Sequence, residues 1–234
     1  FETKINTFLS QLLTENVIES SYKSSIATIW KDRVAKHQEY TAKIPFSDFK
    51  VFDFICQNVP KNSQLQVSNS SAIRYLQLFD LDKSIQVFCN RGTSGIDGST
   101  STAIGAASST NLPTMLITGD ISFLYDSNAL WNNYIPKNFK IILLNNSGGG
   151  IFRILPGHQE TETFNTYFET SHQLNASHLA KMYGLDYFEA NDEATLQQQY
   201  TAFLNQNEKP SILEIFTPEK ENNDILLEFF RRFK

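Results

Sequence analysis

Two groups of residues near the middle of the chain have types and spacing that suit a metal ion. Asp120 directly follows an apolar run that ends in Gly119. Asn146 comes after a second apolar run, residues 141–144, and is separated from it by Asn145. One carboxylate, one carboxamide oxygen and nearby carbonyls make an all-oxygen site that suits Mg2+ or Ca2+, and phosphate oxygens can complete the shell. Gly148, Gly149 and Gly150 then allow close backbone approach and offer free amides to an anion.

The elements around these residues predict how they are brought together. Residues 115–118 and 141–144 read as short strands, and residues 121–131 between them read as a helix. This is the pattern of a parallel βαβ unit, whose strand ends carrying Asp120 and Asn146 lie side by side. Open α/β sheets bind ligands in the crevice beyond these ends. Each feature alone could be a helix cap or a plain loop, but their combination favours a ligand site.

The rest of the chain alternates between predicted strands and predicted helices. Further strands are expected at residues 65–68, 85–89, 185–188 and 211–216. Helices are expected at residues 49–59 with Ser47 as a cap, around Arg74, and at residues 94–107, 175–183, 194–204 and 224–233. This alternation predicts an α/β fold, a doubly wound and mostly parallel sheet of about six strands flanked by helices.

Two segments fall outside the alternation. Residues 1–43 read as helices, and Ile44 with Pro45 ends that pattern. Residues 156–172 are polar and show no periodicity, and a loop of this length inside a domain is usually functional or mobile. His158 and His172 lie in this segment; we expect surface positions and leave a substrate role for either open.

Composition narrows the classes of partner. The formal net charge is −5, so there is no overall positive field to attract nucleic acid or an anionic membrane. No apolar run approaches the length of a membrane span, and no signal peptide is recognisable. Cys56 and Cys89 lie in apolar surroundings and are expected to be buried free thiols, as in a reducing cytoplasm. Because the first residue is Phe1, we expect either a processed N-terminus or a piece of a longer chain.

The residues from Gly119-Asp120 to Asn145-Asn146 resemble the fingerprint of thiamine-diphosphate (ThDP) enzymes, which begins with Gly-Asp and ends with Asn-Asn. That fingerprint alone indicates only a ThDP enzyme. The run NRGTSGIDG at residues 90–98 and the run IFRILP at residues 151–156 narrow the resemblance. Together they resemble the MenD family, the 2-succinyl-5-enolpyruvyl-6-hydroxy-3-cyclohexene-1-carboxylate synthases of the menaquinone pathway. The match covers roughly residues 45–216, and Ile121 replaces the glycine of the commoner fingerprint, as this family accepts.

The resemblance implies two regions and a set of binding roles. Residues 1–43 would be the helical tail of a preceding central domain plus a linker, and residues 44–234 the diphosphate- and Mg-binding domain. Mg2+ or Mn2+ would be held by the residues Asp120, Asn146 and Gly148. ThDP would be held by Ile96, which props its bent shape, and by Gly119, Ser122 and Gly149. Substrate would be bound by Ser70, Arg74, Arg91, Ile151, Phe152 and Leu155.

For the reaction, the resemblance implies decarboxylation of 2-oxoglutarate and addition of the resulting succinyl carbanion to isochorismate. ThDP enzymes also need an activating glutamate on a pyrimidine-binding domain, which precedes the region seen here. No glutamate of this chain has a matching context, and Glu214 on the last apolar strand reads as structural. We therefore expect no catalytic residue in this portion. The implied partners are the chain's own N-terminal domain and a second subunit, in a cytoplasmic homodimer or homotetramer, and the portion alone should fold without turnover.

Three other readings compete with this one. Another ThDP-dependent 2-oxoacid decarboxylase, or an acetolactate-synthase-like enzyme, would share Asp120 and Asn146 but not need Arg74 and Arg91. A non-catalytic module could keep the ThDP fold for assembly or regulation. A metal hydrolase is disfavoured, because its usual histidine or carboxylate clusters are absent from the sequence.

Overall fold

The computed structural model describes residues 21–232 of the chain, which divides into two compact units at the bond between Lys43 and Ile44. In its described part, the first unit is one helix, α2 (Ser21–Lys43), as the sequence predicted. The apolar stripe expected between residues 8 and 13 lies outside the described residues. The assignment of residues 1–43 to a preceding domain stays a prediction.

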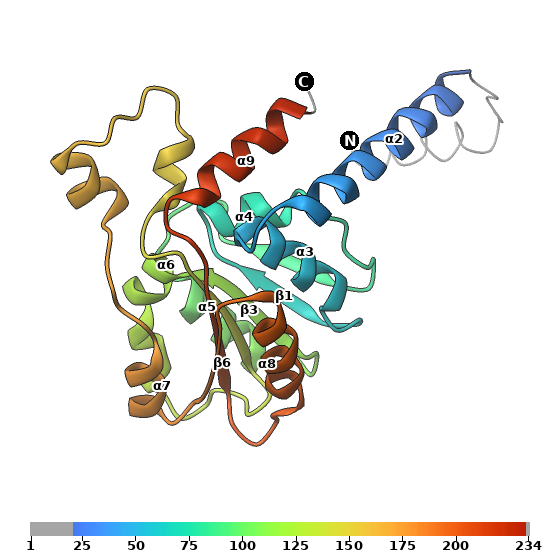
Figure 1. Cartoon of the computed structure of the whole chain (residues 1–234). Helices are drawn as coiled ribbons and strands as arrows, with labels where there is room; N and C mark the ends of the chain where they lie inside the picture. Colours follow the sequence, from blue (N-terminus) through green and yellow to red (C-terminus); the bar gives the residue numbers. More distant parts are fainter. Residues whose placement is uncertain (1–20, 233–234) are drawn as a thin grey trace, which may run out of the picture. The chain divides into compact units, whose positions relative to one another are not determined.

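The second unit is built on a six-stranded sheet with the order β2-β1-β3-β4-β6-β5. All neighbouring strands pair in parallel. The strands are β1 (Gln64–Val67), β2 (Gln86–Cys89), β3 (Thr114–Gly119), β4 (Lys140–Asn145), β5 (Asp186–Ala190) and β6 (Ser211–Phe216). Each expected strand is confirmed, and so is the expected α/β class with its mostly parallel sheet (Figure 1).

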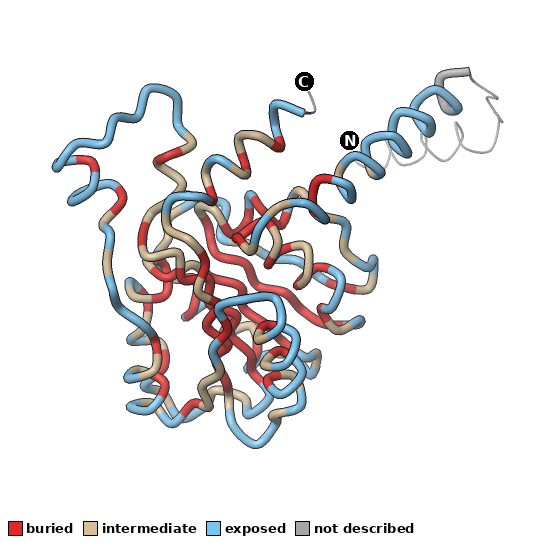
Figure 2. Tube along the Cα trace, viewed as in Figure 1, coloured by how far each residue is buried: buried red, intermediate tan, exposed pale blue. Residues whose placement is uncertain are grey.

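The central strands are buried on both of their faces. Leu116, Ile141 and Leu143 belong to one core cluster. The cluster also contains residues of the helix that follows β2 and of the helix that follows the 156–172 segment. Ile117 and Ile142, which alternate with them along the strands, are also fully buried. Figure 2 shows the central strands as a buried band between helices that are exposed on their outer sides. Burial on both faces is typical of parallel sheets covered by helices on both sides.

The helices follow the predicted order with two differences. They are α3 (Asp48–Asn58), α4 (Ser71–Leu76), α5 (Ser99–Ser108), α6 (Asp120–Tyr125), α7 (Ser177–Tyr183), α8 (Glu193–Asn205) and α9 (Glu221–Arg232). The expected helix over 94–107 begins only at Ser99, because Gly98 takes a left-handed conformation (φ 72°) in front of it. The expected helix over 121–131 breaks after Tyr125 and continues as a 3-10 turn, η1 (Ser127–Trp131).

The break in the second helix has a tertiary cause. Asp126 lies at the junction, and its carboxylate accepts hydrogen bonds from the backbone N–H (2.7 Å) and hydroxyl (2.6 Å) of Ser101 in α5. Because Asp126 is buried, this bond to a neighbouring helix outweighs continuation of α6. Residues 156–172 are also not wholly irregular, since they contain one π-helical segment, η3 (Phe164–Glu169). A short 3-10 segment, η2 (Gly150–Ile154), precedes them.

Candidate functional site

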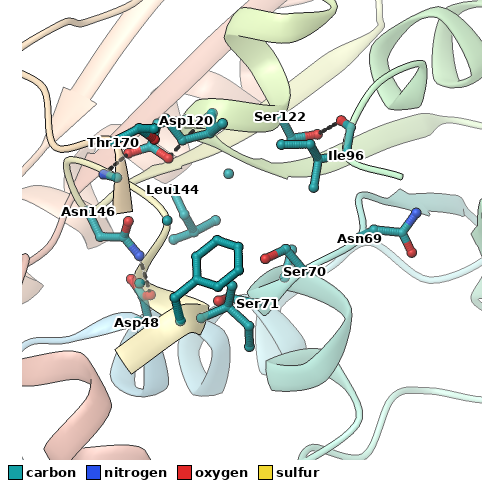
Figure 3. A pocket seen from close by; sticks show the side chains of 18 of the residues that line it. Asp48, Asn69, Ser70, Ser71, Ile96, Asp120, Ser122, Leu144, Asn146 and Thr170 are labelled. Carbon is teal, nitrogen blue, oxygen red and sulfur yellow. Dashed lines mark hydrogen bonds between the residues drawn. The ribbon is translucent and has the colours of Figure 1, made fainter. Parts of the chain in front are cut away.

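A pocket of about 230 Å3 opens beyond the carboxyl ends of the central strands. The predicted βαβ unit places it there: β3 and β4 are parallel neighbours, with Gly119 opposite Leu144 in the register. Most residues predicted to bind a ligand line this pocket (Figure 3). They are Ser70, Ile96, Gly119, Asp120, Ser122, Asn146, Gly148, Gly149, Ile151 and Phe152.

Asp120 sits at the tip of β3 with its carboxylate buried and held at both oxygens. One oxygen accepts the backbone N–H of Ile121 (2.7 Å), and Oδ2 accepts the backbone N–H of Gly148 (2.9 Å). The Nε2 atom of His172 lies 3.3 Å from the same Oδ2, and this neighbour raises the pKa of the His172 imidazole. The side chain is therefore oriented by the loop that follows β4, and the imidazole of His172, which was expected at the surface, lies partly buried beside it.

Asn146 reaches the same pocket from the tip of β4. Its Nδ2 donates to Oδ2 of Asp48 at 2.9 Å. Figure 3 shows the amide oxygen of Asn146 turned away from Asp48, toward the side of the pocket where Asp120 lies. The carboxamide thus presents its oxygen, the atom that binds a hard cation, to the pocket.

The preceding asparagine, Asn145, is turned into the protein instead. Its Nδ2 donates to the buried Glu214 carboxylate (2.7 Å) and to the Leu174 carbonyl (2.9 Å). Glu214 also accepts the backbone N–H of Ala176 (2.9 Å) and the hydroxyl of Tyr187 (2.7 Å), and burial together with this carboxylate raises the pKa of Tyr187. These contacts are those of a structural carboxylate that joins β4, α7 and β5, as expected for Glu214.

The glycines after Asn146 allow a close approach, and the group that approaches is the chain's own backbone. Gly148 has φ 153°, and a Cβ there would lie 2.7 Å from the carbonyl oxygen of Glu169. The backbone N–H of Gly149 donates to that same carbonyl at 2.6 Å, and a Cβ on Gly149 would meet the Phe168 carbonyl at 2.9 Å. Glycine is needed at both positions because residues 168–169 pack directly on the loop.

A buried ion pair anchors that packing segment. Arg153 and Glu169 are 4% and 1% exposed, and the guanidinium donates through both Nε and Nη2 to the two carboxylate oxygens. The Nη1 atom of Arg153 also donates to Glu160, which is half-exposed. The pair holds η3 against η2 and brings Phe168 into the pocket lining, where its ring meets Phe152 edge-on at 5.6 Å.

A second network fixes the opposite wall. The Ser122 hydroxyl donates to the carbonyl of Ile96, which ties the start of α6 to the loop before α5. Asn69, buried after β1, donates to the carbonyls of Asn90 (2.8 Å) and Gly95 (2.6 Å). These bonds shape residues 90–98, the segment whose sequence carried part of the resemblance.

Three predicted substrate residues do not line the pocket. Arg74 is exposed and its Nη1 donates to the carbonyl of Ser70 (2.8 Å). Arg91 is exposed and its Nη1 donates to Oδ1 of Asn69 (2.8 Å). Leu155 is 51% exposed. Each is thus one contact away from the pocket wall or outside it, and their substrate roles stay predictions.

Sequence reasoning missed several residues that build this site. Asp48 and Asn69 both line the pocket, but neither was among the residues predicted to bind a ligand. Phe168 and Tyr167, which also line the pocket, lie in a segment without periodicity. No local pattern marks any of them, because each acts through contacts with residues far away in the sequence.

Within residues 21–232 there is no group of three or more His, Cys, Asp or Glu side chains that could hold a metal ion. A cation at this pocket would therefore have to use amide and carbonyl oxygens in addition to carboxylates. No helix in the same described range is long and apolar enough to cross a membrane.

Comparison with known proteins identifies the family. The sequence model described as "Thiamine pyrophosphate enzyme, C-terminal TPP binding domain" matches residues 69–215. The chain belongs to this family. The matched range of this TPP-binding domain begins at Asn69 and extends to Ile215 in β6, so β1 is the one strand outside it. The predicted metal-binding residues all lie within the matched range.

Curated relatives of this TPP-binding domain share one name, 2-succinyl-5-enolpyruvyl-6-hydroxy-3-cyclohexene-1-carboxylate synthase. The proteins of Flavobacterium johnsoniae and Flavobacterium psychrophilum are each 61% identical over 232 residues, covering 99% of this chain and 42% of the relative. The protein of Bacteroides fragilis is 39% identical over 194 residues, covering 82% of this chain and 35% of the relative. These similarities confirm the resemblance drawn from the sequence runs, and the chain spans less than half the length of these relatives.

Proposed function

We propose that this chain is the C-terminal, diphosphate-binding portion of a ThDP-dependent transferase of menaquinone biosynthesis. The whole enzyme would decarboxylate 2-oxoglutarate and add the succinyl carbanion to isochorismate. The observation that carries the proposal is 61% identity, over 99% of this chain, to two relatives named as that synthase. The pocket at the tips of β3 and β4 supports it, because that is where a TPP-binding domain of this topology offers its ligand groups.

The donor set fits a divalent cation bound together with a diphosphate. The Asp120 carboxylate, the Asn146 amide oxygen and the Gly148 carbonyl are hard oxygen donors on one pocket wall, suited to Mg2+ or Mn2+. A cation here would offset the repulsion between the cofactor's phosphates and an acidic chain of net charge −5. Ser122, Gly119 and Gly149 would contact the phosphates, and Ile96 would support the bent cofactor.

When bound, ThDP supplies the electron sink for the decarboxylation step. The chain's own residues position and shield the reacting groups. Ile151 and Phe152 line the pocket as apolar walls that exclude water, and Phe168 extends this wall from η3. Ser70 would orient the reacting substrate from the N-terminal side of α4, where it already lines the pocket.

The carboxylates of both substrates call for positive groups near the pocket. Arg74 and Arg91 are the proposed partners, because a guanidinium can bind a carboxylate through two parallel hydrogen bonds. Each is one residue contact away from the lining, through Ser70 and Asn69. We propose that these side chains turn into the pocket when substrate is bound, and that Leu155 closes the apolar wall beside them.

The remaining parts of the active site would come from outside this chain. We propose that a pyrimidine-binding domain carries the activating glutamate, and that a second subunit completes the site in a homodimer or homotetramer. The coverage of 42% of the relatives leaves room for such a domain. Both cysteines of the chain are free, which supports a cytoplasmic location for the enzyme.

The decisive experiment is a turnover assay on the full-length protein that contains this chain. With ThDP and Mg2+ it should release CO2 from 2-oxoglutarate and form the conjugate-addition product with isochorismate. Exchange of Arg74 and Arg91 for alanine should abolish use of 2-oxoglutarate. Equal use of 2-oxoglutarate and pyruvate would instead favour another ThDP-dependent decarboxylase, and ThDP binding without any turnover would favour a non-catalytic module. The 234-residue chain assayed alone should show no CO2 release.

A further inference from the structure

A buried carboxylate outside the predicted ligand set touches the proposed metal site. Asp48, the first residue of α3, is 2% exposed and lies 98 positions before Asn146 in the sequence. Its Oδ2 accepts the Nδ2–H of Asn146 at 2.9 Å, and its Oδ1 accepts the hydroxyl of Thr217 at 2.6 Å. Both oxygens of the carboxylate therefore have a fixed partner.

The position of Asp48 is itself fixed by residues at the end of β6 and the start of α9. Its backbone N–H donates to Oδ1 of Asn222 at 2.8 Å. The Nδ2 atom of Asn222 in turn donates to the carbonyl of Pro218 at 2.7 Å, and Asn222 is 6% exposed. The carboxylate thus sits in a rigid, buried setting rather than on a mobile side chain.

This contact decides which end of the Asn146 carboxamide faces the pocket. A carboxamide has one donating end and one accepting end, whereas an ionised carboxylate only accepts. Asp48 can therefore bind the NH2 end of Asn146 but repels its oxygen. Rotation of the amide by half a turn would place two oxygens against each other at Asp48 and would aim NH2 protons at a cation. The carboxylate makes the pocket-facing atom an oxygen.

We propose that Asp48 is a positioning residue that orients the carboxamide of Asn146 so that its oxygen can bind a divalent cation. The inference rests on the proposed function, since it concerns the cation of that same site. Asp48 is not a ligand in this arrangement. Partners that hold metal ligands in place typically change metal affinity by about 10- to 100-fold when they are replaced.

The test measures binding of Mn2+ in the presence of ThDP, by electron paramagnetic resonance, on the full-length protein that contains this chain. Asp48→Leu removes the acceptor and frees the amide of Asn146 to rotate, so the Mn2+ dissociation constant should rise by about tenfold or more. Thr217→Val is the matched control, because it removes the hydrogen bond to the other oxygen of Asp48 but leaves the bond to Asn146. It should lower the melting temperature of the metal-free protein and leave the Mn2+ dissociation constant within about twofold.

An exchange variant separates orientation from simple loss of folding. In Asp48→Asn with Asn146→Asp, the amide at position 48 can donate to one carboxylate oxygen at position 146 and leave the other for the cation. This double variant should bind Mn2+ about tenfold more tightly than Asp48→Leu. Circular dichroism and melting curves on the metal-free proteins verify that each variant is folded.

The possible results either support or overturn the inference. Unchanged Mn2+ affinity in Asp48→Leu, an equal loss in Thr217→Val, or no recovery in the exchange variant would each overturn it. If wild type binds Mn2+ with ThDP and Asp120→Ala abolishes this binding while Asp48→Leu does not change it, only the role of Asp48 fails. If wild type shows no binding of Mn2+ with ThDP, the proposed function fails and the role of Asp48 fails with it.

Discussion

Replacing Glu169 by glutamine should destabilise the fold around the pocket far more than replacing Glu160, although both carboxylates bind Arg153. Glu169 is 1% exposed and binds the guanidinium through two hydrogen bonds, whereas the side chain of Glu160 is 51% exposed. Loss of one partner from a buried ion pair leaves a charge in a poorly solvated place and costs about 3–5 kcal/mol. Because glutamine keeps one acceptor and Glu160 remains, we expect about 2–3 kcal/mol for Glu169→Gln.

The matched variant Glu160→Gln removes an ion pair that is mostly hydrated, so we expect a loss below about 1 kcal/mol. Replacing both buried partners, as in Arg153→Met with Glu169→Leu, removes the unpaired charge together with its partner. That double variant should lose less than the two single variants added together. The comparison tests burial of the pair rather than the mere presence of charge.

The assay is urea unfolding followed by circular dichroism, with the free energy of unfolding extrapolated to zero denaturant. Limited proteolysis of the 156–172 segment gives a local readout, because the ion pair anchors that segment to η2. The segment should be cut faster in Glu169→Gln than in Glu160→Gln. Equal destabilisation by Glu169→Gln and Glu160→Gln would refute the reasoning, since it would mean that the buried bonds add nothing beyond the exposed one.

Two further predictions concern stability at other positions. Burial lowers the pKa of Lys140 from 10.5 to about 8, so between these pH values the unfolded chain binds the proton more strongly and stability should rise with pH. Relative to Lys140→Met, the free energy of unfolding of wild type in urea should rise by about 1–2 kcal/mol from pH 7.5 to 9.5. Relative to the exposed control Lys181→Met, it should show no such rise. Gly148→Ala should cost about 1–3 kcal/mol, because its backbone conformation suits only glycine and the new Cβ would meet the carbonyl of Glu169. The control Gly157→Ala also has a positive φ (83°) but open space around its Cβ, so a larger or equal loss at that position, measured by thermal melting, would contradict the packing argument.

The sheet could be predicted from the sequence because its signals are local. Short apolar runs separated by amphipathic segments specify parallel strands joined by helices, and all six runs became strands. The placement of Asp120 and Asn146 in the lining of one pocket followed from the same pattern, since neighbouring parallel strands end at one edge. What could be read from spacing alone was therefore the location of the site and its two strand-tip side chains.

The rest of the site depends on contacts that spacing does not encode. Asp48 meets Asn146 only through the packing of α3 beside the end of β4, and Glu169 meets Arg153 only because η3 folds back on η2. The break at Asp126 likewise arises from a bond to another helix, which overrides local helix propensity. Family resemblance supplied the predicted roles of Arg74 and Arg91, but their hydrogen bonds to the Ser70 carbonyl and to Asn69 could not be predicted from it.

The most direct test of the account is calorimetric titration of Mn2+ and ThDP into the full-length protein that contains this chain, with Asp120→Asn compared against Asp126→Asn. Both substitutions neutralise a buried carboxylate with minimal change of shape, but only Asp120 lines the pocket, whereas Asp126 binds the start of α5. The account predicts saturable binding by wild type and by Asp126→Asn, with the Asp120→Asn affinity reduced by about tenfold or more. Equal binding by wild type and Asp120→Asn would contradict the claim that the strand tips hold the cation that clamps the cofactor.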